Sequence, residues 1–393
     1  MSTKLESLHK EFQYAFLFAL SQRRNFIPVF SIYIVQVLGI TIEEVGIIVG
    51  ISAIMSLIFE IPSGYFSDYF GHKPTLLLSK VLVVFSMIVF IFGKGFYAIL
   101  LGSILQMLGF AFQPGSFQAY LHDILEGRDE DYLFRGLYTQ LQGRIALWSV
   151  VLSIVLVLSA AIHILIPFVL ALFIDLFGLF CVIKMPDSNN IYTDKTIGIV
   201  ASIRGSWIFV FFMMIFLSLA SSFSFATNNF RTLYLEDMGI PIFLLGFVMG
   251  GSRLAWFVIS KLLHKYEKQL SFLVFMIFEF FFIILSYFAI VYAPNAYFLS
   301  LAFIVQVGYL RARSSVFTHF FLDMCFKKGG KKASLLSVKQ LVSTGVQSII
   351  AFSVADAMGV SFAGGFFSLG VSLVSLLIVF QIIFFVFWRK NKV

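Results

Sequence analysis

Charged residues are scarce in this sequence, and their scarcity argues against a soluble protein. Only 12% of the 393 residues are Asp, Glu, Lys or Arg, and 60% are hydrophobic. Roughly a quarter of the residues are charged in an average soluble domain. Phe alone accounts for 51 residues, more than the cores of one or two soluble domains could bury. We therefore expect most of the chain to lie in a lipid bilayer.

Several motifs are also missing, and each absence removes a class of function. The two cysteines, Cys181 and Cys325, do not suggest a disulfide framework or a metal cluster. The chain contains no Walker-type glycine loop for a nucleoside triphosphate and no His-x-x-x-His motif. We therefore predict that the chain is not an enzyme and that it uses no metal or other cofactor. Its polar N-terminus predicts no cleavable signal peptide.

Apolar stretches of about 18 to 25 residues recur along the whole chain, and each is long enough to cross the bilayer as an α-helix. They predict an all-α polytopic membrane protein with twelve transmembrane helices. The predicted spans are 12–38, 42–66, 74–93, 95–119, 137–160, 162–184, 206–230, 241–262, 269–292, 295–318, 334–357 and 362–388.

Basic residues between these spans are concentrated on one side. Placing the N-terminus in the cytoplasm puts almost all of them on the cytoplasmic side, Lys73 and Lys80 among them, and leaves only Lys94 and Arg231 on the other. The positive-inside rule predicts this arrangement, so we expect both termini in the cytoplasm. We also expect the protein to lie in a bacterial cytoplasmic membrane. The net charge of +8 follows from this topology, and no nucleic-acid partner is expected.

The longest polar interval divides the predicted spans into two sets of six. We predict an N-terminal bundle over residues 1–184, a cytoplasmic linker over 185–205 and a C-terminal bundle over 206–393. Duplicated halves are a common build of secondary transporters, which bind substrate between the halves near the middle of the bilayer.

The loop after the second span carries a recognisable motif. It reads Gly64-Tyr-Phe-Ser-Asp68-Tyr-Phe-Gly71-His-Lys73, which resembles the G-x-x-x-D-x-x-G-x-K signature of the Major Facilitator Superfamily (MFS). With twelve spans in two halves, the resemblance covers the whole chain. It implies two six-helix bundles around a central cavity and secondary active transport by alternating access.

The motif residues also suggest a gating contact. On a helix, Glu60, Gly64, Asp68 and Gly71 form one stripe, where glycines admit a neighbouring helix and the acid accepts hydrogen bonds or pairs with a cation. The family resemblance implies that Asp68, with Gly64, Gly71 and Lys73, holds the cytoplasmic side closed in the outward-facing state.

The sequence departs from the family pattern in places. Tyr69 and His72 replace residues that are usually basic, which predicts a weaker electrostatic latch. Span 4 lacks the Arg-x-x-Gln-Gly pattern of proton-coupled drug antiporters, and span 5 lacks their Gly-x-x-x-Gly-Pro pattern. Asp123 and the segment Glu60-Ile-Pro-Ser-Gly64 resemble features of a bacterial branch of the family. The motifs that usually indicate a proton-coupled antiporter are therefore missing, so they give no support to export.

Polar residues inside the spans are candidate substrate ligands, because a charge at the bilayer centre costs at least about 2.5 kcal/mol. The resemblance implies that spans 1, 4, 7 and 10 line the cavity. Alternatively, amides and hydroxyls only bond between helices, each contributing about 0.6 kcal/mol. The candidates are Arg24, Asn25, Gln106, Gln113, Asn228, Asn229, Gln306, Tyr309, Arg313, Gln340 and Gln347, and pairs such as Gln106 and Gln113, seven residues apart, share a helix face.

The start of the first span leaves two alternatives open. If the span begins near Phe26, Arg23 and Arg24 are cytoplasmic anchors. If it begins near Phe12, both arginines lie within the span, face the cavity and favour an anionic substrate or an acidic partner. The length of the span favours the second alternative.

Three acids inside the spans, Glu60, Asp175 and Glu279, are candidates for proton coupling, because burial favours the protonated form of a carboxyl group. Cavity spans rich in Phe, Met and Tyr favour proton-coupled efflux of small amphipathic molecules. The alternatives are uptake or facilitated transport of a small metabolite, which could be anionic, and a non-transporting receptor or a scramblase. We expect a monomer whose partners are the small-molecule substrate, the proton gradient and the lipid bilayer.

Overall fold

A computed structural model of the chain describes residues 12–23, 26–128, 130–187, 207–266, 271–325 and 332–391. Within these residues the regular secondary structure is entirely helical. Ten helices in the described ranges are long and apolar enough to cross a membrane. The chain is therefore an integral membrane protein with an all-α fold, as its composition predicts.

The two remaining predicted spans, 1 and 10, are helical but are not among these ten helices. Span 1 is divided into α2 (Gln13–Ser21), α3 (Ile27–Ile32) and the π-helical turn η1 (Tyr33–Val37). Span 10 is the 30-residue helix α14 (Ala296–Cys325), whose arginines at positions 311 and 313 lower its mean hydropathy. The helix that begins at Gln13 favours the longer of the two alternatives for span 1.

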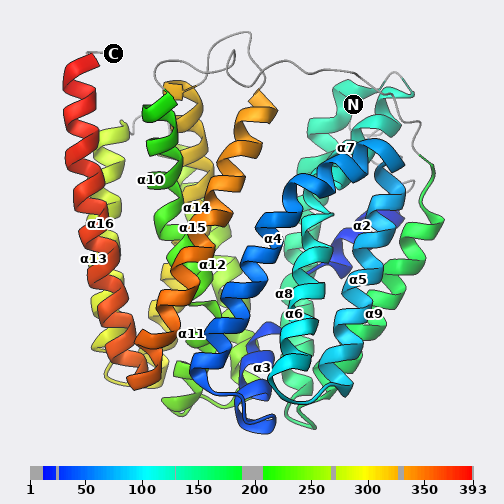
Figure 1. The fold of residues 1–393 in the computed structure, drawn as a ribbon, viewed down its shortest axis with the longest axis horizontal. Coiled ribbons are helices and arrows are strands. Elements are labelled where there is room, and N and C mark those ends of the chain that lie inside the picture. The colour runs from blue at the N-terminus through cyan, green and yellow to red at the C-terminus, as the bar shows by residue number, and fades with distance from the viewer. Residues whose placement is uncertain are drawn as a thin grey trace. The chain divides into compact units, whose positions relative to one another are not determined.

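The chain folds into two compact units (Figure 1). The first takes in the described residues of Met1–Ile40, Ile51–Asp194 and Ile242–Gly250, and the second those of Thr41–Gly50, Lys195–Pro241 and Gly251–Val393. Most of the predicted linker lies outside the described residues, so the domain limits 1–184, 185–205 and 206–393 stay a prediction.

Helix α5 is central to the packing of the first unit. It lies against α6 and α9, and α2 also packs on α9 (Figure 1). Buried apolar side chains such as Phe18, Leu137 and Leu141 form the core. With α2, α3 and η1, the elements are α4 (Ile42–Phe70), α5 (His72–Phe92), α6 (Gly95–Ala111), α7 (Pro114–Glu126), η2 (Asp131–Leu133), α8 (Phe134–Ser159) and α9 (Ile166–Lys184), of which the first turns of α4, up to Gly50, belong to the second unit.

In the second unit, α15 packs against both α10 and α16, and α13 lies along α16. Aromatic contacts link α13 to α14, with the rings of Phe275 and Phe317 5.0 Å apart between centroids. The elements are α10 (Trp207–Ala226), α11 (Asn228–Asp237), η4 (Ile242–Leu244), α12 (Leu245–Tyr266), α13 (Phe272–Val291), α14, α15 (Lys332–Val360) and α16 (Phe362–Asn391), of which η4 and the first turns of α12 belong to the first unit.

Three predicted spans are interrupted, which sequence periodicity did not indicate. Span 1 breaks after Ser21, span 4 breaks between Ala111 and Pro114, and span 7 breaks at Thr227. Pro114 opens α7, because proline has no N–H and fits the first turn of a helix. The buried Thr227 hydroxyl donates to the Phe223 carbonyl at 2.8 Å. Non-helical backbone at membrane depth is tolerated where it is buried in protein or lines a cavity.

Candidate functional site

A buried ion pair lies at the centre of the first unit. Lys80 Nζ on α5 is 2.6 Å from Asp175 Oδ1 on α9, and both side chains are 0% exposed. The same ammonium donates to the Ser21 carbonyl, the last one of α2, at 3.2 Å. The expectation that Lys80 lies in a cytoplasmic loop is therefore wrong: its charge is compensated inside the bundle, where it joins α2, α5 and α9.

A second buried ion pair lies in the second unit. Arg313 Nη2 on α14 is 2.5 Å from Glu279 Oε1 on α13, and the two side chains are 2% and 3% exposed. The guanidinium also lies over the Phe317 ring, 4.2 Å from its centroid. Arg313, a candidate cavity residue, and Glu279, a candidate proton-coupling acid, are thus partners of each other. The third candidate acid, Glu60, is half-buried near the end of α4.

Among the described side chains with buried polar atoms that lack a hydrogen-bond partner, four carry an amide or a phenol. They are the amides of Gln22, Gln106 and Gln306 and the hydroxyl of Tyr309. More than about 90% of buried polar groups in proteins are bonded, so these atoms are available to a ligand or to water. Gln106, Gln306 and Tyr309 are predicted candidates. Sequence reasoning missed Gln22, although it directly precedes the arginine pair in span 1.

The surroundings of Tyr309 are aromatic. Its ring centroid is 3.9 Å from that of Phe282 and 5.8 Å from that of Phe278, both on α13. Three residues earlier on α14, the Gln306 amide donates to Ser286 Oγ at 3.2 Å while its carbonyl oxygen has no partner in the described residues. In the second unit, the unpartnered polar atoms of Gln306 and Tyr309 therefore lie among aromatic side chains.

The other candidate cavity residues that the structure describes belong to both units. Arg24 and Asn25 lie outside the described residues. Gln113 lies in the break between α6 and α7, so the helix that carries Gln106 ends before it, and a shared face of the two residues stays a prediction. The remaining candidates are Asn228, Asn229 and Gln347, which are half-buried, and Gln340, which is exposed.

The signature motif spans the junction of α4 and α5. Gly71 adopts a φ of +96°, which a glycine tolerates readily, and α4 ends at Phe70. Gly71 therefore lies beyond the helix, and the expectation of one helical stripe from Glu60 to Gly71 is wrong at its last position. Gly64 is exposed, with open space where a Cβ would stand. The side chain of Asp68 lies outside the described residues.

The two residues after Gly71 each contact another segment. Lys73 Nζ is 2.8 Å from Asp187 Oδ1, an exposed pair. His72 Nδ1 is hydrogen-bonded to Ser67 Oγ at 2.7 Å, and its Nε2 is 3.3 Å from Asp123 Oδ2 on α7. Ser116 on α7 donates to Ser67 Oγ at 2.8 Å. This network joins α4, α5 and α7, a role for His72 that the sequence did not predict.

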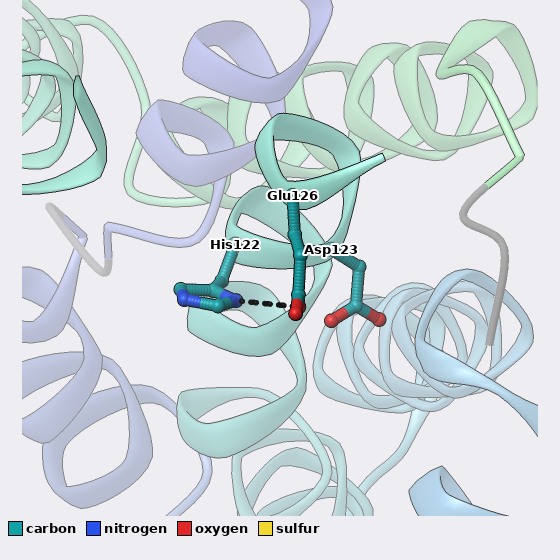
Figure 2. A group of neighbouring side chains, drawn as sticks. All are labelled: His122, Asp123 and Glu126. Carbon is teal, nitrogen blue, oxygen red and sulfur yellow. Dashed lines mark ion pairs between the residues drawn. The ribbon is translucent and has the colours of Figure 1, made fainter. Parts of the chain in front are cut away.

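Asp123 belongs to a second small group on α7. Figure 2 shows it beside His122 and Glu126, with an ion pair of 3.4 Å between His122 Nδ1 and Glu126 Oε2. The three ligand atoms lie within 4.8 Å of one another, and His122 and Glu126 are about half exposed. Pairs of this kind at i and i+4 are ordinary on exposed helix faces, and the absence of a metal stays a prediction.

An apolar groove of about 290 Å³ lies between α13 and α16. Tyr287, Phe288 and Tyr292 line one side, and Phe367, Gly370 and Val371 line the other. Gly370 permits the close packing of Tyr287, since a Cβ there would stand 2.9 Å from the tyrosine ring.

A sequence-family model identifies the family, and solved structures show the same fold. A sequence model of the Major Facilitator Superfamily matches residues 14–325. The nucleoside transporter NupG superposes with a TM-score of 0.75 at 12% identity, covering 96% of this chain and 98% of that one. A D-xylose-proton symporter gives 0.71 at 12%, covering 94% and 96%. An inward-facing bacterial homologue of the iron transporter ferroportin gives 0.71 at 14%, covering 96% and 98%. No curated protein matches.

Proposed function

The chain belongs to the Major Facilitator Superfamily, and we propose that it exports small amphipathic molecules by alternating access, driven by the proton gradient. Family membership makes it a transporter and not an enzyme. The observation that supports an amphipathic substrate is the combination of unpartnered polar atoms on Gln306 and Tyr309 with the aromatic side chains around them. Such a mixture holds an apolar molecule and orients it through a few hydrogen bonds.

We assign gating to the motif at the end of α4. The open space at Gly64 leaves room for a helix to approach closely, and Asp68 would supply the hydrogen-bond acceptor at that contact. The His72 network would hold the adjoining ends of α5 and α7 in place. This assignment places the motif and both termini in the cytoplasm of a bacterial cell, with the protein acting as a monomer in the cytoplasmic membrane.

Proton coupling is assigned to at least one of Glu60, Asp175 and Glu279. Replacing each with its amide (E60Q, D175N and E279Q) in a vesicle assay with an imposed pH gradient tests this. We expect at least one variant to keep substrate binding and lose its response to the gradient. Unchanged pH dependence in all three variants contradicts proton coupling through these acids, and loss of binding alone makes the acid a ligand.

A susceptibility and accumulation screen tests the direction and class of transport. Cells that express the protein should accumulate less of an amphipathic compound than cells that lack it, and the difference should disappear in D68N. Higher accumulation in expressing cells would indicate uptake. Purified protein in vesicles should then move the same compound without exchanging phospholipids between leaflets, which distinguishes a transporter from a scramblase or a receptor.

A further inference from the structure

Three basic side chains are buried to more than nine-tenths in the described part of the chain. Lys80 and Arg313 each have a carboxylate partner, Asp175 and Glu279 respectively. The third, Arg231 on α11, is 6% exposed and has no carboxylate partner among the described residues. It was expected in a loop outside the membrane, but α11 buries it in the second unit.

The groups around Arg231 are neutral or positive. Its Nη2 donates to Ser224 Oγ at 3.0 Å, and its guanidinium lies 5.9 Å from the centre of the Phe303 ring. Its Nε is buried without a hydrogen-bond partner. The titratable groups close enough to interact with it electrostatically are Tyr287 on α13 and Arg311 on α14. A phenol is neutral near pH 7, and a second arginine repels the first, so the charge of Arg231 stays uncompensated.

A buried charge without a partner is unfavourable in a protein interior and more so within a membrane, where such residues mark substrate pathways. A guanidinium carries five N–H donors in a planar fork that matches two oxygens of a carboxylate or a phosphate. Ser224 accepts only one hydrogen bond from this fork. The remaining donors, Nε among them, are therefore available to an anionic group.

The local fold keeps this site polar at one point and apolar around it. Thr227 ends α10 and bonds to carbonyls of the preceding turn, so α11 starts as a separate helix, with Asn228 and Asn229 half-buried in its first turn. One turn further along α11, Arg231 packs beside the apolar side chain of Phe303 on α14. Phe303 in turn contacts Phe366 on α16. An anion that carries an apolar group fits both parts.

We propose that Arg231 binds the anionic group of the transported molecule, a carboxylate or a phosphate attached to an apolar body. This inference rests on the proposed transport function and defines its substrate class. It makes Arg231 a specificity-determining residue, because a neutral molecule of the same shape would leave the buried guanidinium uncompensated.

Ligand-induced thermal stabilisation of the full chain in phosphatidylcholine nanodiscs tests the proposal. The probes are octanoate, octyl phosphate and the neutral octanamide. We expect the wild type to bind an anionic probe at least tenfold more tightly than octanamide. R231Q should reduce this ratio to within twofold, and R231K should give an intermediate ratio because an ammonium lacks the planar fork. R144Q, which removes an exposed arginine of the first unit, should keep the wild-type ratio.

Equal affinity of the wild type for the anionic and neutral probes, no binding of either anion, or an unchanged ratio in R231Q would each overturn the proposal. If R231Q does not fold, the wild-type and R231K ratios decide in its place. Adding phosphatidylglycerol to the nanodiscs tests whether a lipid headgroup is the anion that Arg231 binds. If this lipid stabilises the wild type but not R231Q and prevents octanoate from binding, the site does not serve transport. Binding of an anion without flux in vesicles contradicts export and leaves the assignment of Arg231 intact.

Discussion

Replacing one member of the Lys80–Asp175 pair should destabilise the protein strongly, whereas replacing both should not. At 2.6 Å and an effective dielectric constant of about 20, the Coulomb attraction is roughly 6 kcal/mol. Desolvation opposes it by several kcal/mol for each ion. Removing one partner loses the attraction and leaves the other charge buried, so K80M and D175L should each lower the free energy of unfolding by about 3–5 kcal/mol.

The double variant K80M/D175L leaves no buried charge. Because two apolar side chains of similar volume often replace a buried pair without loss, we expect its free energy of unfolding to lie within about 1 kcal/mol of the wild type. Chemical unfolding in detergent micelles measures all four proteins in one thermodynamic cycle. The Lys73–Asp187 pair provides a matched control, since its atoms are 2.8 Å apart but Asp187 is 91% exposed. D187N should therefore change stability by less than about 1 kcal/mol.

Single variants within 1 kcal/mol of the wild type would refute this reasoning, because they would mean that water or another group compensates the remaining charge. A double variant whose loss equals the sum of the two single losses would refute it too, because Lys80 and Asp175 would then contribute independently. A loss in D187N as large as that in D175L would show that burial is not the cause.

Three further predictions concern neighbouring features. Gly178→Ala should destabilise the protein by about 1–3 kcal/mol in the same unfolding assay, because its Cβ would stand 2.5 Å from Lys80 Cε. Gln306→Leu should weaken substrate binding in a ligand-stabilisation assay and change unfolding by less than about 1.5 kcal/mol, because one of its amide atoms already lacks a partner. His72→Ala should cost about 1–3 kcal/mol in unfolding, since it removes the bridge between Ser67 and Asp123, and an unchanged value would contradict that bridge.

The helical fold and the family could be predicted because they depend on patterns that survive in a single sequence. Apolar stretches of membrane length predict helices wherever they occur, and the motif from Gly64 to Lys73 needs only its spacing. Lys80 shows the limit of this reasoning. In the sequence Lys80 closely follows a basic loop, so it was predicted to belong to that loop. In the fold its charge is paired with Asp175 on α9, a residue distant in sequence, and this pairing allows Lys80 to lie inside the bundle.

The helix breaks were missed for a related reason. Hydropathy is averaged along a span, so the apolar residues that precede Thr227 and those around Phe112 hide an interruption. A break also interrupts the regular spacing from which a shared helix face is predicted, as at Gln113. Pro114 was the available signal for the break in span 4, because proline cannot donate the hydrogen bond that a helix interior requires. Arg231 had no such signal, since only the tertiary fold makes it the one buried cation of the described chain without an acid.

The two buried ion pairs bear on which acid couples transport to protons. A coupling acid must change its surroundings as the protein alternates between states. Asp175 is held by Lys80 within the first unit, and Glu279 by Arg313 within the second. Protonation of either acid would neutralise its carboxylate and leave a buried cation uncompensated, which is unfavourable in either state. Glu60, one turn before Gly64 on α4, is only half-buried, so a change in its charge costs less desolvation than at the two fully buried acids. Among the three amide variants, E60Q should therefore alter the pH dependence of transport, while D175N and E279Q should chiefly lower stability.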